Sequence, residues 1–303
     1  MNVLISGIIT QGFIYGIMAM GVIVTYLVLD FPDLTVDGSF PLGGAVAASL
    51  LLSGVNPWVC CILAFIAGAL AGTVTGLLHV KLHIKNLLSS IITMTALYSI
   101  NLHIAGKANL FIGSTKTIFS FENGIFSSME TGIATLLTAF LLAVFIKILL
   151  DLFMKTKKGF LVRTVGDNPQ LVTALGQDIG KVKIIGLAIA NGFAALSGAV
   201  ICQYQQFFDI SMGTGTIVMG LAAVILGKTI FGRLRFLQLS TVAILGTIIY
   251  RATIAIALNV GFESMDLKLI TAVVFVIALV LSSSELKENV LRLFKGKSDA
   301  GVN

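Results

Sequence analysis

The sequence predicts an all-α, polytopic membrane protein in which about nine helical segments form one domain over residues 1–303. Composition is the first reason: 57% of the residues are hydrophobic and 11% are charged, whereas soluble domains carry about 25% charged residues. The second reason is the mean hydropathy of +1.01. The third is that apolar residues gather in runs near the roughly 20 residues that cross the hydrocarbon core of a bilayer.

Short polar, glycine-containing or proline-containing stretches separate the apolar runs. The runs cover residues 4–29, 39–53, 57–79, 84–105, 131–154, 181–203, 214–228, 236–258 and 266–284. Each is expected to be helical, because backbone groups that face lipid need hydrogen bonds within their own segment. The first run lacks a basic leader and is long enough to span, so we interpret it as a membrane helix rather than a signal peptide. The second and seventh runs are short and interrupted by Gly or Pro.

Fifteen of the 20 Lys and Arg residues lie in alternate connections between the runs. These connections are residues 80–86, 155–183, 228–235 and 285–303. The intervening connections contain two such residues, Lys107 and Lys116. Because cytoplasmic loops are rich in Lys and Arg, this distribution predicts a cytoplasmic C-terminus and an N-terminus outside. It also accounts for the net charge of +6 without a nucleic-acid partner.

The C-terminal tail, residues 285–303, is predicted to be cytoplasmic. Within it, Leu286, Val290 and Leu293 recur at helical spacing among basic residues. This pattern is typical of an amphipathic helix on the inner membrane surface, and a frayed tail is the alternative.

A weak internal repeat relates the two halves of the chain. The segment Asp33–Val36 resembles Asp209–Met212, and Gln11–Phe13 resembles Asn191–Phe193. The charge distribution gives the copies opposite orientations, as in transporters whose broken helices border the substrate path. Chance similarity between segments rich in Gly, Ala and Val is the alternative.

Residues 30–41 interrupt the apolar sequence with three carboxylates, two prolines and two hydroxyls. Pro32 and Pro41 are expected to prevent a continuous helix. Free backbone groups and ionisable side chains at membrane depth usually border a water-filled path. The predicted pathway residues are Asp33, Thr35, Asp37, Gly38, Ser39, Asp209, Ser211 and Gly213. A cytoplasmic turn, with Thr35 or Ser39 capping the next helix, is the alternative.

The basic connection at residues 155–183 is predicted to be a cytoplasmic docking element. Asn168-Pro169 suits the start of a short helix and Gly176 suits its end. Apolar residues within this polar loop favour contact with another protein. They are Phe160, Leu161, Leu171 and Leu175. A solvated basic loop is the alternative.

Other patterns predict no metal, cofactor or catalytic residue. Gly227-Lys228-Thr229 resembles the end of a P-loop, but the first glycine of that motif is missing and an apolar run precedes it. His79 and His83 have helical spacing without a third metal ligand nearby, which favours a solvated loop. The cysteines lie in apolar runs and are interpreted as packing residues. They are Cys60, Cys61 and Cys202.

At these motifs the sequence resembles the permeases of binding-protein-dependent ABC importers of the ribose and branched-chain amino-acid type. Leu29–Ala48 is similar to their Asp-Leu-Ser-Val-Gly-Ser segment, Gly159–Gly176 to their coupling segment, and Met219–Gly232 to their late glycine-rich span. Together the matches cover most of residues 10–260, in the same order. Asp37 inserts a carboxylate relative to the sugar permeases, which resembles the amino-acid branch, including permeases assigned to aromatic amino acids.

The resemblance implies a subunit of the bacterial inner membrane that moves a small polar solute, an aromatic or branched-chain amino acid, into the cytoplasm. Two copies of the chain would form the pathway, a cytoplasmic ATPase would bind ATP, and an extracytoplasmic substrate-binding lipoprotein would deliver the solute. The implied ATPase-coupling residues are Gly159, Arg163, Gly166, Asn168, Pro169, Ala174 and Gly176. The alternatives are ABC import of a sugar or nucleoside, and an ion-coupled transporter using Lys147 or Asp209.

Overall fold

The computed structural model describes residues 3–113, 115–121, 130–232, 237–263 and 266–282. The α-helices in this part of the chain are α1 (Val3–Val22), α2 (Val36–Leu52), α3 (Pro57–Lys81), α4 (Asn86–Ala105), α5 (Thr131–Lys155), α6 (Lys157–Asp167), α7 (Pro169–Ala174), α8 (Ile179–Gln205), α9 (Thr216–Phe231), α10 (Leu239–Val260) and α11 (Leu267–Ser282). The other elements are the π-helix η1 (Ile23–Val28), the 3-10 helix η2 (Ile210–Gly213) and the strands β1 (Asn109–Phe111) and β2 (Phe207–Asp209). The amphipathic helix predicted in the C-terminal tail lies outside the described residues.

Helix length and composition confirm a predominantly helical, multi-pass membrane protein. Seven segments of the described chain are long and apolar enough to cross a membrane. They are Ile5–Val28, Pro57–Lys81, Asn86–Ala105, Thr131–Lys155, Ile179–Gln205, Ile210–Phe231 and Leu239–Val260. α2 and α11 are also apolar but shorter. Each of the predicted runs coincides with one α-helix, and the first run also includes η1.

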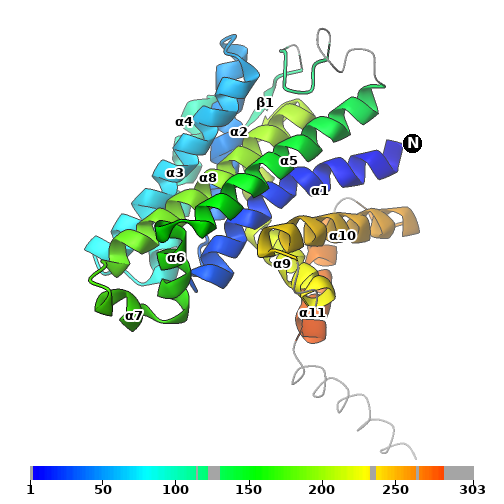
Figure 1. Cartoon of the computed structure of the whole chain (residues 1–303). Helices are drawn as coiled ribbons and strands as arrows, with labels where there is room; N and C mark the ends of the chain where they lie inside the picture. The colour runs from blue at the N-terminus through cyan, green and yellow to red at the C-terminus, as the bar shows by residue number, and fades with distance from the viewer. Residues whose placement is uncertain (1–2, 114, 122–129, 233–236, 264–265, 283–303) are drawn as a thin grey trace, which may run out of the picture.

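The long helices lie side by side in one bundle, with α8 at its centre (Figure 1). α8 packs against α1, α2 and α3. Gly68, Gly72 and Gly76 form a stripe on α3, and a Cβ at Gly68 or Gly72 would meet a backbone carbonyl of α8. Small residues let membrane helices approach each other closely, so this stripe determines how near α3 lies to α8.

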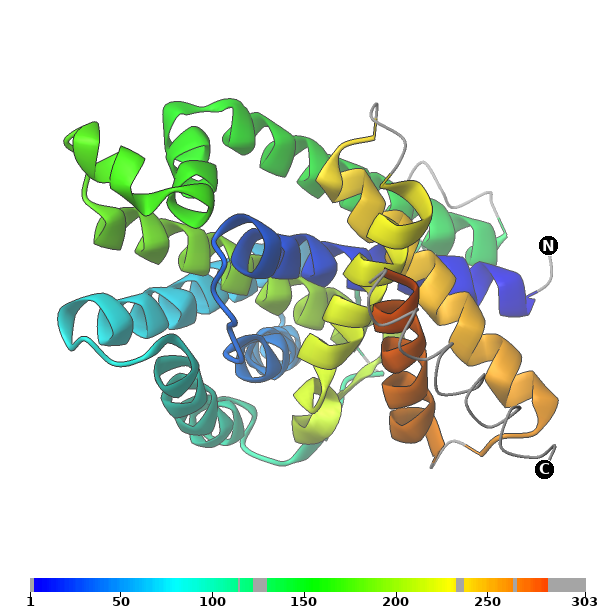
Figure 2. The same cartoon turned by 90° about the horizontal axis from the view of Figure 1, so that it is seen from below.

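α9, α10 and α11 form a second group that meets the bundle mainly through α1, as Figure 2 shows from below. α1 packs on α8 and also on α10, and α9 packs on α10 and α11. α9 and α10 cross closely at Gly227 and Gly246. A Cβ added at either glycine would meet a carbonyl of the facing helix. α1 is therefore the element through which the two groups are joined.

The first break in the helical chain lies between η1 and α2. η1 ends at Val28, Asp30 has a positive φ of 50°, and α2 starts at Val36. This confirms the break predicted at Pro32. Several of the seven residues between the two helices are buried, and the segment lacks regular backbone hydrogen bonding, so its buried polar groups need other partners.

The break predicted at Pro41 is wrong, because Pro41 lies inside α2. Proline lacks the N–H that would bond to the carbonyl four residues earlier, which here belongs to Asp37. Gly213 packs against this carbonyl and the Pro41 ring. A neighbouring segment therefore covers the site of the missing bond, and the helix continues past it.

The second break separates α8 from α9 and contains β2 and η2. β2 pairs antiparallel with β1, with Asn109 opposite Asp209. The all-α prediction lacks this small sheet, because a three-residue strand within a loop leaves no periodic pattern. The sheet ties the connection after α4 to the entrance of α9.

The basic connection folds into two helices where one was predicted. α6 follows α5 directly, and the Thr156 hydroxyl accepts a hydrogen bond from the Gly159 N–H at 3.2 Å. α7 begins at Pro169, with the Asn168 side chain accepting a bond from the Leu171 N–H at 3.2 Å. α6 and α7 lie at the end of the long helices that is remote from the N-terminus (Figure 1).

Candidate translocation site and coupling helices

A buried hydrogen-bond network joins the first break to α8. Asp33 is 2% exposed, and its carboxylate accepts bonds from the Thr35 N–H at 2.9 Å and the Asn191 amide at 2.7 Å. The Asn191 oxygen accepts a bond from the Ser39 hydroxyl at 2.7 Å. A carboxylate buried without partners is costly, so Asn191 allows Asp33 to lie inside the protein. The predicted pathway residues Asp33, Thr35 and Ser39 thus share one buried network.

Two side chains that the sequence analysis missed hold the same segment. The Thr75 hydroxyl of α3 lies 2.8 Å from the Thr35 hydroxyl. The Asn101 amide of α4 donates to the Gly38 carbonyl at 3.1 Å, while the buried Asn101 Oδ1 has no hydrogen-bond partner. An amide within an apolar run is the available signal for such a residue, and it also applies to Asn191, which we predicted only as part of the repeat.

Asp37 joins the two halves of the chain. From the first turn of α2, its carboxylate accepts hydrogen bonds from the Gly215 N–H at 3.0 Å and the Ile217 N–H at 2.7 Å. The Thr216 hydroxyl donates to the same carboxylate at 2.9 Å. These groups form the N-terminus of α9, where unpaired N–H groups and the helix dipole favour a negative charge. Asp37 therefore caps the short helix of the opposite half.

Asp209 and Ser211 form a turn at the second break. The Asp209 carboxylate accepts bonds from the Ser211 N–H at 2.6 Å and the Ser211 hydroxyl at 2.5 Å. Its other oxygen lies 3.0 Å from the Asn109 amide nitrogen, in the amide orientation that satisfies its neighbours. Asp33 makes the same bond to an N–H two residues on, so both breaks contain an Asx turn. The structure brings Gly213 against α2, whereas the side chains of Asp209 and Ser211 bond to each other and Asp209 also to Asn109 of β1.

Two pockets border the contact between Asp37 and α9, and Thr214 lines both. The α4 pocket has a volume of about 320 Å³. Its polar lining comprises Asp37, Thr95, Tyr98, Asn101 and Thr214. The tyrosine pocket has a volume of about 360 Å³. Its polar lining comprises Tyr15, Thr214, Thr216, Tyr250, Lys268 and Thr271. The breaks of both halves thus end beside cavities large enough for a small solute.

The residues of the coupling segment divide into an exposed set and a packed set. The exposed predicted residues are Arg163, Asn168, Pro169, Ala174 and Gly176. The apolar side chains of Phe160, Leu171 and Leu175 are 58%, 45% and 53% exposed, which is typical of an interaction surface. Gly159 and Gly166 instead pack inward. A Cβ added at Gly159 would meet the Phe153 carbonyl of α5, and one added at Gly166 would meet the Val28 carbonyl of η1.

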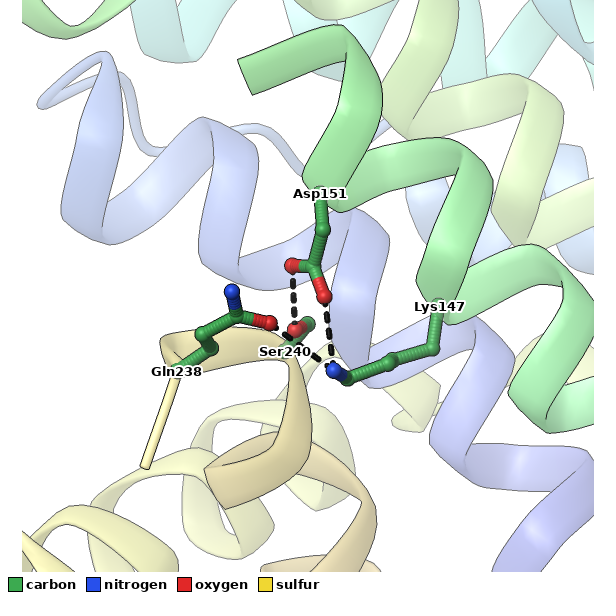
Figure 3. A network of polar contacts seen from close by, with 4 residues as sticks. All are labelled: Lys147, Asp151, Gln238 and Ser240. Carbon is green, nitrogen blue, oxygen red and sulfur yellow. Dashed lines mark hydrogen bonds and ion pairs between the residues drawn. The ribbon is translucent and has the colours of Figure 1, made fainter. Parts of the chain in front are cut away.

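A charged network joins α5 to the start of α10 (Figure 3). Lys147 forms an ion pair with Asp151 at 2.8 Å and donates to the Gln238 side chain at 2.8 Å. The Ser240 hydroxyl donates to Asp151 at 2.6 Å. A pocket of about 500 Å³ borders this network and Arg163 of α6. Because Lys147 is paired, it is a poor candidate for a free ion-coupling group.

The remaining motifs have structural partners. Gly227-Lys228-Thr229 is part of α9, so its N–H groups do not form a phosphate-binding loop. The His79 ring has Nδ1 2.8 Å from the Ile84 carbonyl and Nε2 3.3 Å from the Lys183 ammonium. Among the described residues, no group of three or more His, Cys, Asp and Glu could hold a metal ion.

The membrane-length helices form a bundle, two interrupted segments meet at the half-buried carboxylate of Asp37, and a polar helix pair lies at one end. This is the architecture of a membrane transport permease. The chain belongs to the family described as "Branched-chain amino acid transport system / permease component", which it matches over residues 4–282. It is accordingly the permease component of an amino-acid transport system and not an enzyme.

Named relatives agree with this family. The chain is 44% identical over 272 residues to the tyrosine transport system permease protein of Clostridioides difficile, covering 90% of this chain and 89% of that protein. It is 25% identical over 235 residues to the probable branched-chain amino acid transport permease protein LivH of Methanocaldococcus jannaschii, covering 75% and 74%. A solved chain of PsaBC from Streptococcus pneumoniae, in complex with Fab, has the same fold with a TM-score of 0.53 and 15% identity, covering 96% of this chain and 94% of that one.

Proposed function

We propose that the chain is the membrane-spanning permease of an ATP-binding-cassette importer that carries an aromatic amino acid, with tyrosine as the first candidate, into the cytoplasm. Its partners are a cytoplasmic ATPase that binds the ATP, an extracytoplasmic substrate-binding lipoprotein and a second copy of the chain, in the bacterial inner membrane. The choice of tyrosine derives from the relative that is 44% identical.

The contact between α6 and η1 carries this proposal. Gly166 packs on the Val28 carbonyl, and η1 continues directly from α1, which packs on both helix groups. Phe160, Leu171 and Leu175 form the proposed ATPase docking surface. A displacement of α6 by the ATPase would therefore move η1 and the break beside it, as expected of a bistable helix packing driven from outside the membrane.

In the proposed topology, nine segments cross or enter the membrane and the C-terminus is cytoplasmic. α2 and α9 are the corresponding short segments of two inverted halves. The Asx turns at Asp33 and Asp209 support this correspondence, since each begins the approach to one short helix. The distribution of Lys and Arg supports the orientation.

In the proposed pathway, the predicted polar residues act mainly as joints between segments. Asp33 and Ser39 are bound to Asn191 in the interior, and Asp37 is bound to α9. Opening the path to the other side of the membrane would change how α2 meets α9. Asp37 is the side chain that holds these two helices together, so we assign it to the gate.

Reconstitution with the candidate partners tests this function. The purified chain is combined with an ATPase and a lipoprotein encoded beside it, and uptake of radiolabelled L-tyrosine into proteoliposomes is measured. We expect uptake that requires ATP and both partners. Transport that ignores ATP but follows a proton or sodium gradient would overturn the proposal.

A matched pair of variants tests the docking surface. Leu175→Asp should prevent the ATPase from copurifying with the chain, because it places a charge in an apolar contact. Phe111→Asp changes a side chain that is 74% exposed on β1, away from α6 and α7, and should leave copurification unchanged. Equal ATPase recovery from both variants would remove α7 from the interface.

A further inference from the structure

An arginine lies deep within α10, far from both ends of the helix. At about 1.5 Å per residue, Arg251 is roughly 18 Å from Leu239 at the start of α10 and roughly 14 Å from Val260 at its end. α10 is one of the helices long and apolar enough to cross a membrane. A charge at this depth is costly and usually marks a functional site.

An aromatic ring, rather than a carboxylate, holds the guanidinium group. The Arg251 Cζ lies 3.9 Å from the centroid of the Tyr15 ring of α1. Tyr15 stacks in turn on Phe40 of α2, with the ring centroids 5.7 Å apart. The Arg251 Nε is buried without a hydrogen-bond partner. The cation is thus stabilised by a cation–π contact that leaves the Nε–H free to donate a hydrogen bond.

The neighbouring helices provide no free carboxylate for this cation. In the described chain, α1, α5, α9 and α11 pack on α10, and Asp151 of α5 is the single Asp or Glu within them. Asp151 is paired with Lys147 and bonded to Ser240. A half-buried cation in a membrane-length helix, without a counter-ion among the described residues, favours an anion that arrives from outside the fold.

The tyrosine pocket lies next to this cation. Arg251 is one contact away from the lining: its guanidinium lies over the ring of Tyr15, and Tyr15 lines the pocket together with Tyr250, the residue before Arg251 on α10. Lys268 provides a cation in the lining itself, and Thr214 provides a hydroxyl. Its volume of about 360 Å³ lies within the usual range for small-molecule sites. The pocket therefore combines aromatic walls with positive charge.

We propose that the tyrosine pocket is a transient binding site for the amino acid in transit. Arg251 and Lys268 bind its carboxylate, and the rings of Tyr15 and Tyr250 pack against its side chain. This assignment rests on the proposed function and adds the chemistry that the permease itself recognises. In the empty state the Tyr15 ring stabilises the guanidinium, and the carboxylate competes with it on entry. A site that must release its solute is expected to bind weakly.

A pair of probes that differ in one charge tests the proposal. The purified full chain in phosphatidylcholine nanodiscs is unfolded thermally with L-phenylalanine or with L-phenylalaninamide, which lacks the carboxylate. A ligand that binds the folded state raises the unfolding midpoint. We expect L-phenylalanine to raise it and the amide to have little effect. Equal shifts with both probes would overturn the proposal, and this comparison needs no variant.

Substitutions then assign the carboxylate to its cation. Arg251→Gln should weaken the response to L-phenylalanine at least about tenfold in concentration, equivalent to about 1.4 kcal/mol, and Arg251→Lys should retain part of it. Tyr15→Phe keeps the ring and should respond like the unaltered protein. Lys228→Gln removes an exposed cation at the other end of α9 and serves as the matched control. An unchanged response in Arg251→Gln would overturn the assignment.

A lipid headgroup is the competing anion, and a further arm identifies it. If phosphatidylglycerol raises the unfolding midpoint through Arg251 while L-phenylalanine does not, the cation serves the lipid and the proposal fails. These measurements contain no ATPase. A failure here therefore leaves ATP-driven uptake, the test of the importer itself, to be decided separately.

Discussion

Single polar side chains hold the first break in place, and Asn191 has the central role among them. Asn191→Ala removes the amide that donates to Asp33 at 2.7 Å and the oxygen that accepts from Ser39. Because a buried carboxylate then loses its partner, we expect a loss of about 2 kcal/mol of stability. The thermal unfolding midpoint of the detergent-solubilised protein measures it.

The control for this variant is another amide in a membrane helix. Asn259 of α10 is exposed and donates to the Ala255 carbonyl of its own helix, so Asn259→Ala should change stability by less than about 0.5 kcal/mol. If both alanine variants unfold at the same temperature, the buried network contributes nothing specific to the fold.

The charge of Asp37 is predicted to matter for transport. In Asp37→Asn the side chain loses its negative charge at the N-terminus of α9 and directs an amide toward N–H groups. We expect uptake to fall about tenfold while the amount of protein in the membrane stays the same. Radiolabelled uptake in cells, normalised by immunoblot, measures the effect.

Asp30→Asn is the matched change in the same stretch. Asp30 is exposed and has a φ of 50°, a conformation that asparagine adopts readily. Uptake by the Asp30→Asn variant should equal that of the unaltered protein. A similar decrease in both variants would mean that uptake depends on negative charge throughout the break, and that the contact with α9 is not the gate.

At the scale of whole elements, the packing of α6 on η1 is predicted to transmit motion. A Cβ in Gly166→Ala would meet the Val28 carbonyl and force α6 away from η1. The exposed docking surface is unchanged, so we expect the ATPase to bind and hydrolyse ATP while uptake per ATP falls about tenfold. Parallel assays of phosphate release and tyrosine uptake in proteoliposomes give this ratio.

Gly132 provides the corresponding control for helix propensity. It lies in the first turn of α5, where the nearest atom to an added Cβ would be the Ser6 Oγ at 3.9 Å. Gly132→Ala should preserve coupling and stabilise the helix slightly. Normal coupling in Gly166→Ala would indicate that the ATPase acts through another element.

The contact between α5 and α10 is predicted to depend on two side chains jointly. Asp151 accepts a bond from Ser240 at 2.6 Å across the two helices. A double-mutant cycle of Asp151→Asn and Ser240→Ala should give a coupling energy of about 1 kcal/mol in unfolding measurements. Strictly additive effects would mean that the network in Figure 3 does not hold the helices together.

The helices were predictable from the sequence, whereas their joints were only partly so. A lipid-spanning helix requires an apolar run of about 20 residues, and such a run can be recognised from neighbouring residues alone. The caps of α7 are also local signals, and Asn168 and Gly176 lie where predicted. Thr75 and Asn101 were missed because their partners are distant in the sequence. Pro41 was misread because its covering partner, Gly213, is also far along the chain.

At the scale of the whole molecule, the chain is predicted to expose one end of the bundle to each side of the membrane. Single cysteines at exposed positions, labelled with an impermeant maleimide in intact cells, measure this. The native Cys60, Cys61 and Cys202 are buried, so they should react slowly and give a low background. Lys107→Cys should label from outside, and Thr173→Cys of α7 should label only after permeabilisation.

Ser53→Cys decides whether the short helix α2 completes its crossing. Ser53 is exposed directly after α2, which is shorter than the seven membrane-length segments. If α2 carries the chain from the inner break to the outer surface, position 53 should label as readily as position 107. If it labels only after permeabilisation, α2 re-enters on the cytoplasmic side. The two halves would then cross the membrane a different number of times, and the inverted correspondence between α2 and α9 would be lost.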